Sequence, residues 1–473
     1  MNVLVSYHTD PRYMSPAQFS PSQVSCGPFY EDANKGGVAI SRKTPVGMYD
    51  IKPIVESLPI SQRPDLIIVK SDATRMNFPR NIGSLGIPSV LVIGDTQHQK
   101  SPLQTLIRYA AMEKYTVYVA DHVRRHLHFF LEAGLRNVFW APALNLRDWK
   151  IPFQQRRTVP LTFVGQSGKF HPFRRAILER LAADPVLQLH MGTATQAEAS
   201  KIYASSECTL NLSMNGDVNL RVFEVLAAGG FLLTDRLHSQ AGMDLLFQSG
   251  VHLETFADYD ELRDKCLYYR AHPDEAMKIA WRGYSEFRRS HTPELKHRQL
   301  FALACKGRAD DTWCAHLDRR SIATTFKGAD AFFNRIANYE YFQQRQLDGA
   351  SQRILFSKGA DPALAADLAD LYRANVFSLA TDQRAYFQRA GVAGEVTIIE
   401  RMEEACQIDS LVVSASEVES GSAAEIISTV KTKTVLVDDL LLDSKVATTA
   451  VAALTSLGYA PTVEHPNFFE IKN

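Results

Sequence analysis

Residues 211–235, NLSMNGDVNLRVFEVLAAGGFLLTD, decide the fold of this chain. They predict a strand that ends near Leu212, a turn at Asn215-Gly216-Asp217, a helix from about Val218 and a second strand at 231–234. Strand, turn and helix in this order form the repeating unit of parallel sheets. Such a turn leaves free backbone N–H groups at the start of the helix, and together with the helix dipole they suit an anion such as a diphosphate.

Two charged side chains follow the turn on one face of the predicted helix. Arg221 and Glu224 are three residues apart, which places them on neighbouring turns. Arg221 can offer a fork of donors to a diphosphate, and Glu224 can accept hydrogen bonds from two ribose hydroxyls. The alternative is an Arg–Glu pair on the surface of an ordinary helix, which would contribute little to stability.

Working outward, short apolar runs alternate with helical patterns on both sides of this stretch. The predicted strands lie at 2–7, 66–69, 89–93, 117–119, 161–164, 188–191, 209–212 and 231–234. This alternation predicts two successive α/β domains with parallel sheets, which we place at residues 1–147 and 158–306. Residues 11–43 are rich in Pro, Ser, Gly and Asn, so they are expected to form a loop. Ligands of such sheets bind beyond the carboxyl ends of the strands, in a cleft between the domains.

The rest of the chain predicts a linker and a third module. Residues 307–349 are charged and helical, with aromatic side chains expected to pack against a neighbouring domain. Residues 350–473 alternate again, in an order that resembles a class I methyltransferase sheet in topology. The turn after the first strand contains one glycine, Gly359, where a cofactor loop has several. We therefore expect a degenerate Rossmann module that does not bind S-adenosylmethionine.

Composition narrows the classes of function. The 473 residues contain 52 basic and 52 acidic side chains, and zero net charge disfavours a non-specific nucleic-acid binder or a membrane-surface protein. We expect no export signal in MNVLVSYHTD, and no apolar run approaches the roughly 20 residues needed to span a bilayer. The six cysteines form no CxxC pair, which favours reduced thiols in a cytoplasmic protein without a zinc site.

The residues around the turn resemble a known family. Asn219, Arg221, Phe223, Glu224, Leu226, Ala227, Gly229 and Gly230 are similar to the N-x-R-x-F-E-x-L-A-x-G-G signature of CgeB-like glycosyltransferases. Phe163-Val164-Gly165 with Arg174 and Arg175 resembles the family's opening of the second domain. The resemblance covers about residues 60–305 and is strongest over 161–298. These enzymes are related to the larger GT-B class, which carries an E-x7-E signature.

The resemblance implies a GT-B fold, in which two Rossmann-like domains face each other and the second mainly holds a nucleotide sugar. By position, Glu224 would bind the donor ribose and Arg221 the diphosphate, with Asn215, Gly216, Asp217 and Asn219 beside them. The expected co-substrate is a UDP-sugar, with no cofactor and no metal. One departure is visible: the first acidic residue of E-x7-E falls on Gly216, and the nearest carboxylate is Asp217. The sugar contacts and the stereochemistry therefore stay open.

Two further loops carry candidate residues. Gly165-Gln166-Ser167-Gly168-Lys169 follows a predicted strand and can bind phosphate through its backbone, Ser167 and Lys169, or can be a plain turn. In the first domain, Asp95 and His98 follow another strand, where many GT-B enzymes place a catalytic or acceptor-binding His or Asp. Either can act as a base towards an acceptor hydroxyl, or His98 can be an exposed loop residue. Asp121 is expected to cap the helix predicted at 121–133.

The sequence thus predicts a cytoplasmic glycosyltransferase that moves a sugar from a nucleotide diphosphate to an acceptor hydroxyl. The acceptor can be a surface glycan, a protein or modified DNA, and the neutral charge disfavours DNA. Two alternatives stay open. One is a non-catalytic protein that binds nucleotide sugars, suggested by the missing acidic residue. The other is a bifunctional enzyme with methyl transfer in the last module.

Overall fold

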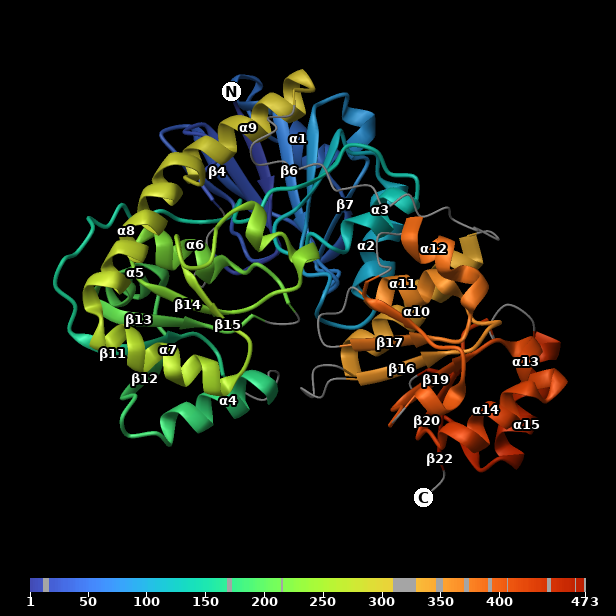
Figure 1. Cartoon of the computed structure of the whole chain (residues 1–473). Helices are drawn as coiled ribbons and strands as arrows, with labels where there is room; N and C mark the ends of the chain where they lie inside the picture. Colours follow the sequence, from blue (N-terminus) through green and yellow to red (C-terminus); the bar gives the residue numbers. More distant parts are fainter. Residues whose placement is uncertain are drawn as a thin grey trace. The chain divides into compact units, whose positions relative to one another are not determined.

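The computed structural model describes residues 1–11, 17–167, 172–213, 216–308, 329–345, 352–369, 374–389, 394–405, 407–439, 444–463 and 465–471. Lys169 and Asn215, two of the expected donor-binding residues, lie outside the described residues. The chain divides into two compact units, Met1–Leu317 and Asp318–Asn473 (Figure 1). Among the described residues, no helix is both long and apolar enough to cross a bilayer.

The first unit begins with a sheet whose described strands run in the order β10-β9-β8-β6-β1-β2-β4-β3. Neighbouring strands are parallel except β3 and β4, which form an antiparallel hairpin. The strands are β1 Val3–Ser6, β2 Gln23–Gly27, β3 Ala33–Lys35, β4 Val38–Lys43, β6 Leu66–Ser71, β8 Ser89–Ile93, β9 Val117–Ala120 and β10 Val138–Trp140. The helices of this domain are α1 Lys52–Glu56, α2 Pro102–Met112 and α3 Leu127–Glu132. A separate parallel pair joins β5 Gly47–Asp50 to β7 Asn77–Arg80.

Two local expectations for this domain were wrong. Residues 11–43 are not a loop, because β2, β3 and β4 extend the sheet to its far edge. Strand β2 alternates between half-buried and buried residues, and β3 and β4 expose most of their side chains, so none of the three has the long apolar run of a strand buried on both faces. The helix predicted at 121–133 begins only at Leu127, and its N-cap residue is His126 rather than Asp121.

A second parallel sheet follows in the same unit, in the order β12-β11-β13-β14-β15. Its strands are β11 Val159–Val164, β12 Leu189–Gly192, β13 Ser206–Asn211, β14 Leu232–Asp235 and β15 Glu254–Phe256. Its helices are α4 Pro172–Ala182, α5 Gln196–Ser205, α6 Leu220–Ala227, α7 Tyr259–Ala271 and α8 Pro273–Ser290. The decisive stretch therefore forms β13, a turn, α6 and β14, as predicted.

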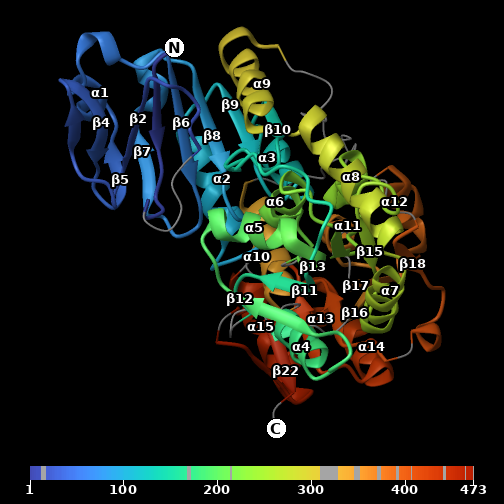
Figure 2. The same ribbon diagram turned by 90° about the vertical axis from the view of Figure 1, so that its left-hand side faces the viewer.

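The last helix of the unit, α9 Pro293–Lys306, returns to the first sheet. Its residues Leu300, Leu303 and Ala304 are buried in the core cluster that also contains residues of β1, β6, β8 and β9. Figures 1 and 2 show α9 beside this sheet, whereas α8 lies with the second domain. The chain thus crosses between the domains twice, once through residues 141–158 and once between α8 and α9. Burial of α9 in the first core ties the second domain to the first.

The second unit contains a mixed sheet in the order β18-β17-β16-β19-β20-β22-β21. Its strands are β16 Gln352–Phe356, β17 Ala374–Ser378, β18 Val396–Ile398, β19 Ser410–Val413, β20 Thr434–Val437, β21 Tyr459–Pro461 and β22 Phe468–Ile471. Strand β22 runs antiparallel between β20 and β21, and the other pairs are parallel. This order confirms the predicted methyltransferase-type sheet and its final hairpin.

Helices cover both faces of that sheet (Figure 1). They are α10 Ala329–Arg345, α11 Pro362–Ala369, α12 Arg384–Arg389, α13 Ala415–Ser420, α14 Ser422–Val430 and α15 Ser444–Ser456. Helix α10, which carries the aromatic side chains noted in the sequence, packs within this unit. Its Tyr341 ring lies 3.6 Å from that of Phe468, and Arg335 Nε lies 3.1 Å from Asp367 Oδ2.

The burial of α9 predicts a large stability loss when one of its core contacts is removed. Leu300→Ala should destabilise the full chain by about 2–5 kcal/mol, because Leu300 is fully buried among the side chains of the first domain. Urea unfolding followed by circular dichroism measures the change. Leu245→Ala is the matched control, because Leu245 is 56% exposed. Equal shifts of the two variants would contradict the packing role of α9.

Candidate functional site

The candidate donor site lies at the carboxyl ends of β11 and β13, which are neighbours in the second sheet. The turn after β11 contains Gly165, Gln166 and Ser167, and the turn after β13 contains Gly216 and Asp217. Arg174, on α4, joins the two turns: its Nη1 donates to Gln166 O at 3.1 Å and its Nη2 to Leu212 O at 2.6 Å. The two predicted phosphate turns are therefore brought together by one guanidinium.

Arg221 lies beneath the first of these turns rather than reaching out from α6. Its Nε donates to Val164 O at 2.9 Å, and its Nη1 donates to Asn211 Oδ1 at 2.8 Å. The guanidinium also lies 4.6 Å from the centre of the Phe163 ring. Arg221 thus shapes the turn through two hydrogen bonds to the protein, and its positive charge stays next to the expected diphosphate.

Glu224 lies one turn further along α6 and is half-buried. Gln196 Nε2 donates to its Oε1 at 3.4 Å. Burial raises the pKa of Glu224, and the charge of Arg221 partly opposes that rise. Both side chains are described, and no ion pair joins Arg221 to Glu224, so the simple surface pair is not formed.

The start of α6 has the features of an anion site. Asn219 is its N-cap residue, and within the described residues no side chain caps the first turn of the helix. Gly216 has φ +72°, a left-handed conformation that glycine adopts without strain. Asn219 Nδ2 donates to Asn211 Oδ1 at 3.1 Å, while its Oδ1 is buried without a partner in the described part of the chain. The first backbone N–H groups of α6 are thus left for a ligand.

One contact brings the candidate loops of the two domains together. Gln97, in the loop after β8, donates from Nε2 to Asp217 Oδ2 at 3.4 Å, and both side chains are buried. The same loop carries Asp95, whose side chain is 40% exposed, and His98, which is half-buried. Within the described residues, no hydrogen bond or ion pair holds the His98 side chain. The loop after β8 in the first domain therefore meets the turn after β13 in the second domain.

Residues 121 and 122, at the end of β9, form a polar cluster that the sequence interpretation missed. Asp121 does not cap a helix; it accepts hydrogen bonds from Lys70 Nζ at 2.8 Å and Asn145 Nδ2 at 2.9 Å. His122 Nε2 lies 3.4 Å from Asp121 Oδ1 and 3.9 Å from Asp95 Oδ1. Burial acts against ionisation of Asp121, but His122 and Lys70 lower its pKa. The available signal was the Asp-His pair directly after a predicted strand.

A second His–Asp pair connects the carboxyl ends of β1 and β6. His8 Nε2 lies 2.9 Å from Asp72 Oδ2. Burial opposes ionisation of Asp72, but the hydrogen bond and charge of His8, together with Thr74, lower its pKa to about 2. The carboxyl ends of β1, β6, β8 and β9 thus all present charged or imidazole side chains, as expected for the ligand-binding edge of a parallel sheet. Among the described residues, no cluster of His, Cys, Asp and Glu has the arrangement of a metal site.

In the second unit, the turn at the equivalent edge of the sheet is hydrogen-bonded to a side chain of the same unit, Glu417. Gly359, in the turn after β16, donates its N–H to Glu417 Oε1 at 3.0 Å, and Ser357 Oγ donates to the same carboxylate. Ser414 N also donates to Glu417 Oε2 at 3.0 Å. The backbone donor that such a turn would offer to a cofactor is therefore used by Glu417.

The first unit has the GT-B architecture. It contains two successive Rossmann-like domains, which are joined by a linker and by a final helix that returns to the first domain. Residues 154–304 match the family described as "Glycosyl transferase-like", Glyco_trans_1_2, so the match spans the second domain. No curated protein sequence matches the chain.

Similar solved structures include TarM, with a TM-score of 0.39, 10% identity, and coverage of 50% of this chain and 54% of TarM. Anabaena Alr3699/HepE in complex with UDP and glucose has a TM-score of 0.45 and 11% identity, over 65% of this chain and 100% of that protein. A glycosyltransferase from Rickettsia africae ESF-5 has a TM-score of 0.46 and 11% identity, over 64% of this chain and 98% of that protein. The chain thus spans about half the length of TarM.

The turn after β11 predicts a sharp effect of a single methyl group. Gly165 has φ +146°, and a Cβ at this position would overlap Nη2 of Arg221. Gly165→Ala should displace Arg221 and weaken UDP binding about tenfold or more, because both the turn and its adjacent charge move. Calorimetry with UDP measures this. Gly192→Ala is the control, because nothing lies within 4 Å of a Cβ there. Unchanged affinity in Gly165→Ala would remove this turn from the site.

Proposed function

We propose that this chain is a glycosyltransferase that moves a sugar from a nucleotide-diphosphate sugar, most simply a UDP-sugar, to an acceptor hydroxyl. The contact between Gln97 and Asp217 carries this proposal, because it holds the loop with Asp95 against the turn at the start of α6. An anion site and a carboxylate with access to solvent then lie on opposite sides of one domain boundary. The family match over residues 154–304 supports the same activity.

In this proposal the donor is bound mainly by backbone groups and Glu224. The N–H groups after Gly216 and at the start of α6 bind the diphosphate, and Glu224 accepts hydrogen bonds from the ribose hydroxyls. Arg174 and Arg221 hold the two turns in place and supply positive charge next to the leaving group. Charge on the leaving oxygen grows in the transition state, so these preorganised groups act most strongly there. Gln166 and Ser167 line the same turn.

On the acceptor side, we propose that Asp95 accepts the proton of the attacking hydroxyl. Its carboxylate is partly exposed at the end of β8, whereas His122 behind it is mostly buried. His122 Nε2 lies 3.4 Å from Asp121 Oδ1 and 3.9 Å from Asp95 Oδ1, so His122 is a neighbour of the proposed base and not its hydrogen-bond partner. His98 is the second candidate for the base, since it lies in the same loop.

We propose four further properties on the same basis. The chain belongs with the CgeB-like group, because the N-x-R-x-F-E pattern falls on α6 and its neighbouring turn. The transfer needs no resident metal, since backbone dipoles and two guanidinium groups can neutralise the diphosphate. The reaction takes place in the cytoplasm, which suits the free thiols of Cys26, Cys208, Cys266 and Cys305. The second unit is structural or recruits the acceptor, because Glu417 occupies its cofactor turn.

Glu224 gives a pH-dependent test of the donor site. Glu224→Ala should weaken UDP binding by about 2–4 kcal/mol, through loss of charge-assisted hydrogen bonds. Because burial raises the pKa of Glu224, its carboxylate is lost at a higher pH than for an ordinary glutamate. UDP affinity should therefore fall as the pH drops towards that raised value, and Glu224→Gln should leave only the pH dependence that titration of the UDP phosphate contributes.

Calorimetry between pH 5 and 8 measures both effects of the Glu224 variants. The control is Glu179→Gln, which removes an exposed carboxylate on α4. A Glu224→Ala variant with the affinity of the parent would show that the ribose is bound elsewhere.

The base assignment is tested by two variants in one loop. Asp95→Asn should lower kcat for donor turnover by about a hundredfold or more and leave UDP affinity unchanged, because a general base acts in the transition state. His98→Gln should have a smaller effect. A larger loss in His98→Gln would identify His98 as the base. Absence of donor hydrolysis and of transfer in the unaltered chain, with UDP still bound, would favour the non-catalytic binding protein.

A further inference from the structure

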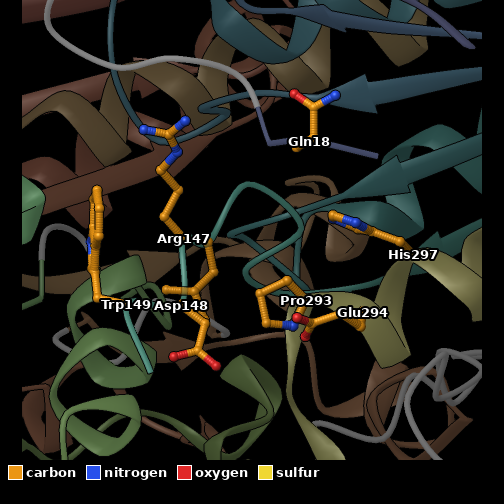
Figure 3. Close-up of a pocket in the computed structure, with 8 residues that line it drawn as sticks. Gln18, Arg147, Asp148, Trp149, Pro293, Glu294 and His297 are labelled. Carbon is orange, nitrogen blue, oxygen red and sulfur yellow. The ribbon is translucent and has the colours of Figure 1, made fainter. Parts of the chain in front are cut away.

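A pocket of about 350 Å³ lies in the first unit, where the chain leaving β10 passes the first turn of α9. None of the donor or acceptor candidates lines it. Its lining residues are Gln18, Leu146, Arg147, Asp148, Trp149, Pro293, Glu294 and His297 (Figure 3). The pocket is thus formed by the linker between the two Rossmann-like domains and by the helix that crosses back.

The two carboxylates that line the pocket are already paired with basic side chains. Two carboxylates, Asp148 and Glu294, line it against one guanidinium, Arg147. Asp148 accepts hydrogen bonds from Arg288 Nη1 and from Lys150 N, and Glu294 Oε1 lies 3.1 Å from Lys150 Nζ. With both carboxylates paired, the wall leaves one guanidinium, that of Arg147, without a carboxylate partner in the described residues. A single guanidinium does not balance the several negative charges of a nucleoside diphosphate. The pocket therefore does not duplicate the donor site and suits a neutral ligand.

The same walls offer an aromatic surface and free polar atoms. Trp149 is 40% exposed, and in the described part of the chain the Arg147 guanidinium contacts only its ring, at 5.7 Å from the centre. Gln18 donates its Nε2 to Ser20 O, which leaves its Oε1 as an acceptor. The pocket thus combines an indole face, a planar fork of donors and an amide acceptor.

His297 adds a hydrogen-bond acceptor, because its surroundings fix which ring nitrogen carries the proton. Burial lowers the pKa of His297, so the ring is neutral at pH 7. Its Nε2 lies 3.2 Å from Leu144 O and must carry the proton to form that hydrogen bond. The other nitrogen, Nδ1, is then an acceptor, and Figure 3 shows the ring directed towards the pocket.

We propose that this pocket binds one or two sugar rings of an acceptor glycan, away from the reacting hydroxyl. A sugar ring has an apolar face that stacks on an indole, and hydroxyl groups that need both donors and acceptors around them. The volume is at the lower end of the range for small-ligand sites, which suits a ligand of this size. The inference rests on the proposed transferase function, whose acceptor it assigns to the glycans.

The site also lies at the joint between the domains. Residues 146–149 belong to the linker, and Pro293 and Glu294 begin α9. A glycan that contacts both segments would stabilise the arrangement of the two domains to which it binds more tightly. The size of this effect is set by the difference between its affinities for the arrangements.

Calorimetry of the full chain with neutral trisaccharides tests the proposal, with maltotriose, cellotriose and chitotriose as probes. At least one should bind saturably, and Trp149→Ala should raise its Kd about tenfold or more. Trp281→Ala is the matched control, because Trp281 is 52% exposed on α8 and does not line the pocket. Thermal unfolding checks that both variants fold.

UDP titrations of the same samples separate this proposal from the transferase function. Trp149→Ala should bind UDP as tightly as the parent chain. Trisaccharide binding that depends on Trp149, in a chain that does not bind UDP, would keep the pocket and remove the transferase function. Failure of all three probes to bind the parent chain, or equal affinity of the two tryptophan variants, would overturn the glycan pocket whatever the UDP result.

Discussion

The buried guanidinium of Arg174 is the interaction on which the candidate donor site depends. It is 7% exposed and connects the two turns that follow β11 and β13 through their carbonyl groups. Burial lowers the pKa of Arg174 to about 10, which still leaves it charged at neutral pH. The guanidinium carbon of Arg174 lies 5.7 Å from the centre of the Phe163 ring, and that of Arg221 lies 4.6 Å from the same centre. Two cations around one ring thus set the shape of both turns and keep positive charge beside them.

The second constraint is the double crossing between the domains of the first unit. Helix α9 inserts apolar side chains into the first core, and Lys296, 1% exposed, donates to Pro142 O in the linker. Its ammonium also lies 4.5 Å from the centre of the Phe223 ring on α6. A charge buried in this way needs both partners, so linker, α6 and α9 are specified together. The glycan pocket is lined by two of these three segments.

The second unit shows how one sheet edge can be used differently. Its strand order places a turn after β16 at the same topological position as the turns of the first unit. There the Glu417 carboxylate takes the hydrogen bonds of Gly359, Ser357 and Ser414. A carboxylate in the protein therefore occupies the place of a ligand oxygen. Fold alone does not decide function, and the side chains at the edge of the sheet do.

The sequence by itself determined the strands and helices around the decisive stretch, since alternation of apolar runs and helical periods depends only on local order. It also located Gly165, Gly216, Arg221 and Glu224 at strand ends and on one helix face. It did not predict β2 to β4, because β2 is short and only partly apolar, and β3 and β4 expose most of their side chains. Only the tertiary structure decided that Arg221 hydrogen-bonds Val164, that Asp121 pairs with Lys70, and that Gln97 meets Asp217. These contacts join residues 51 to 120 positions apart, and no local pattern records which strand ends a sheet brings side by side.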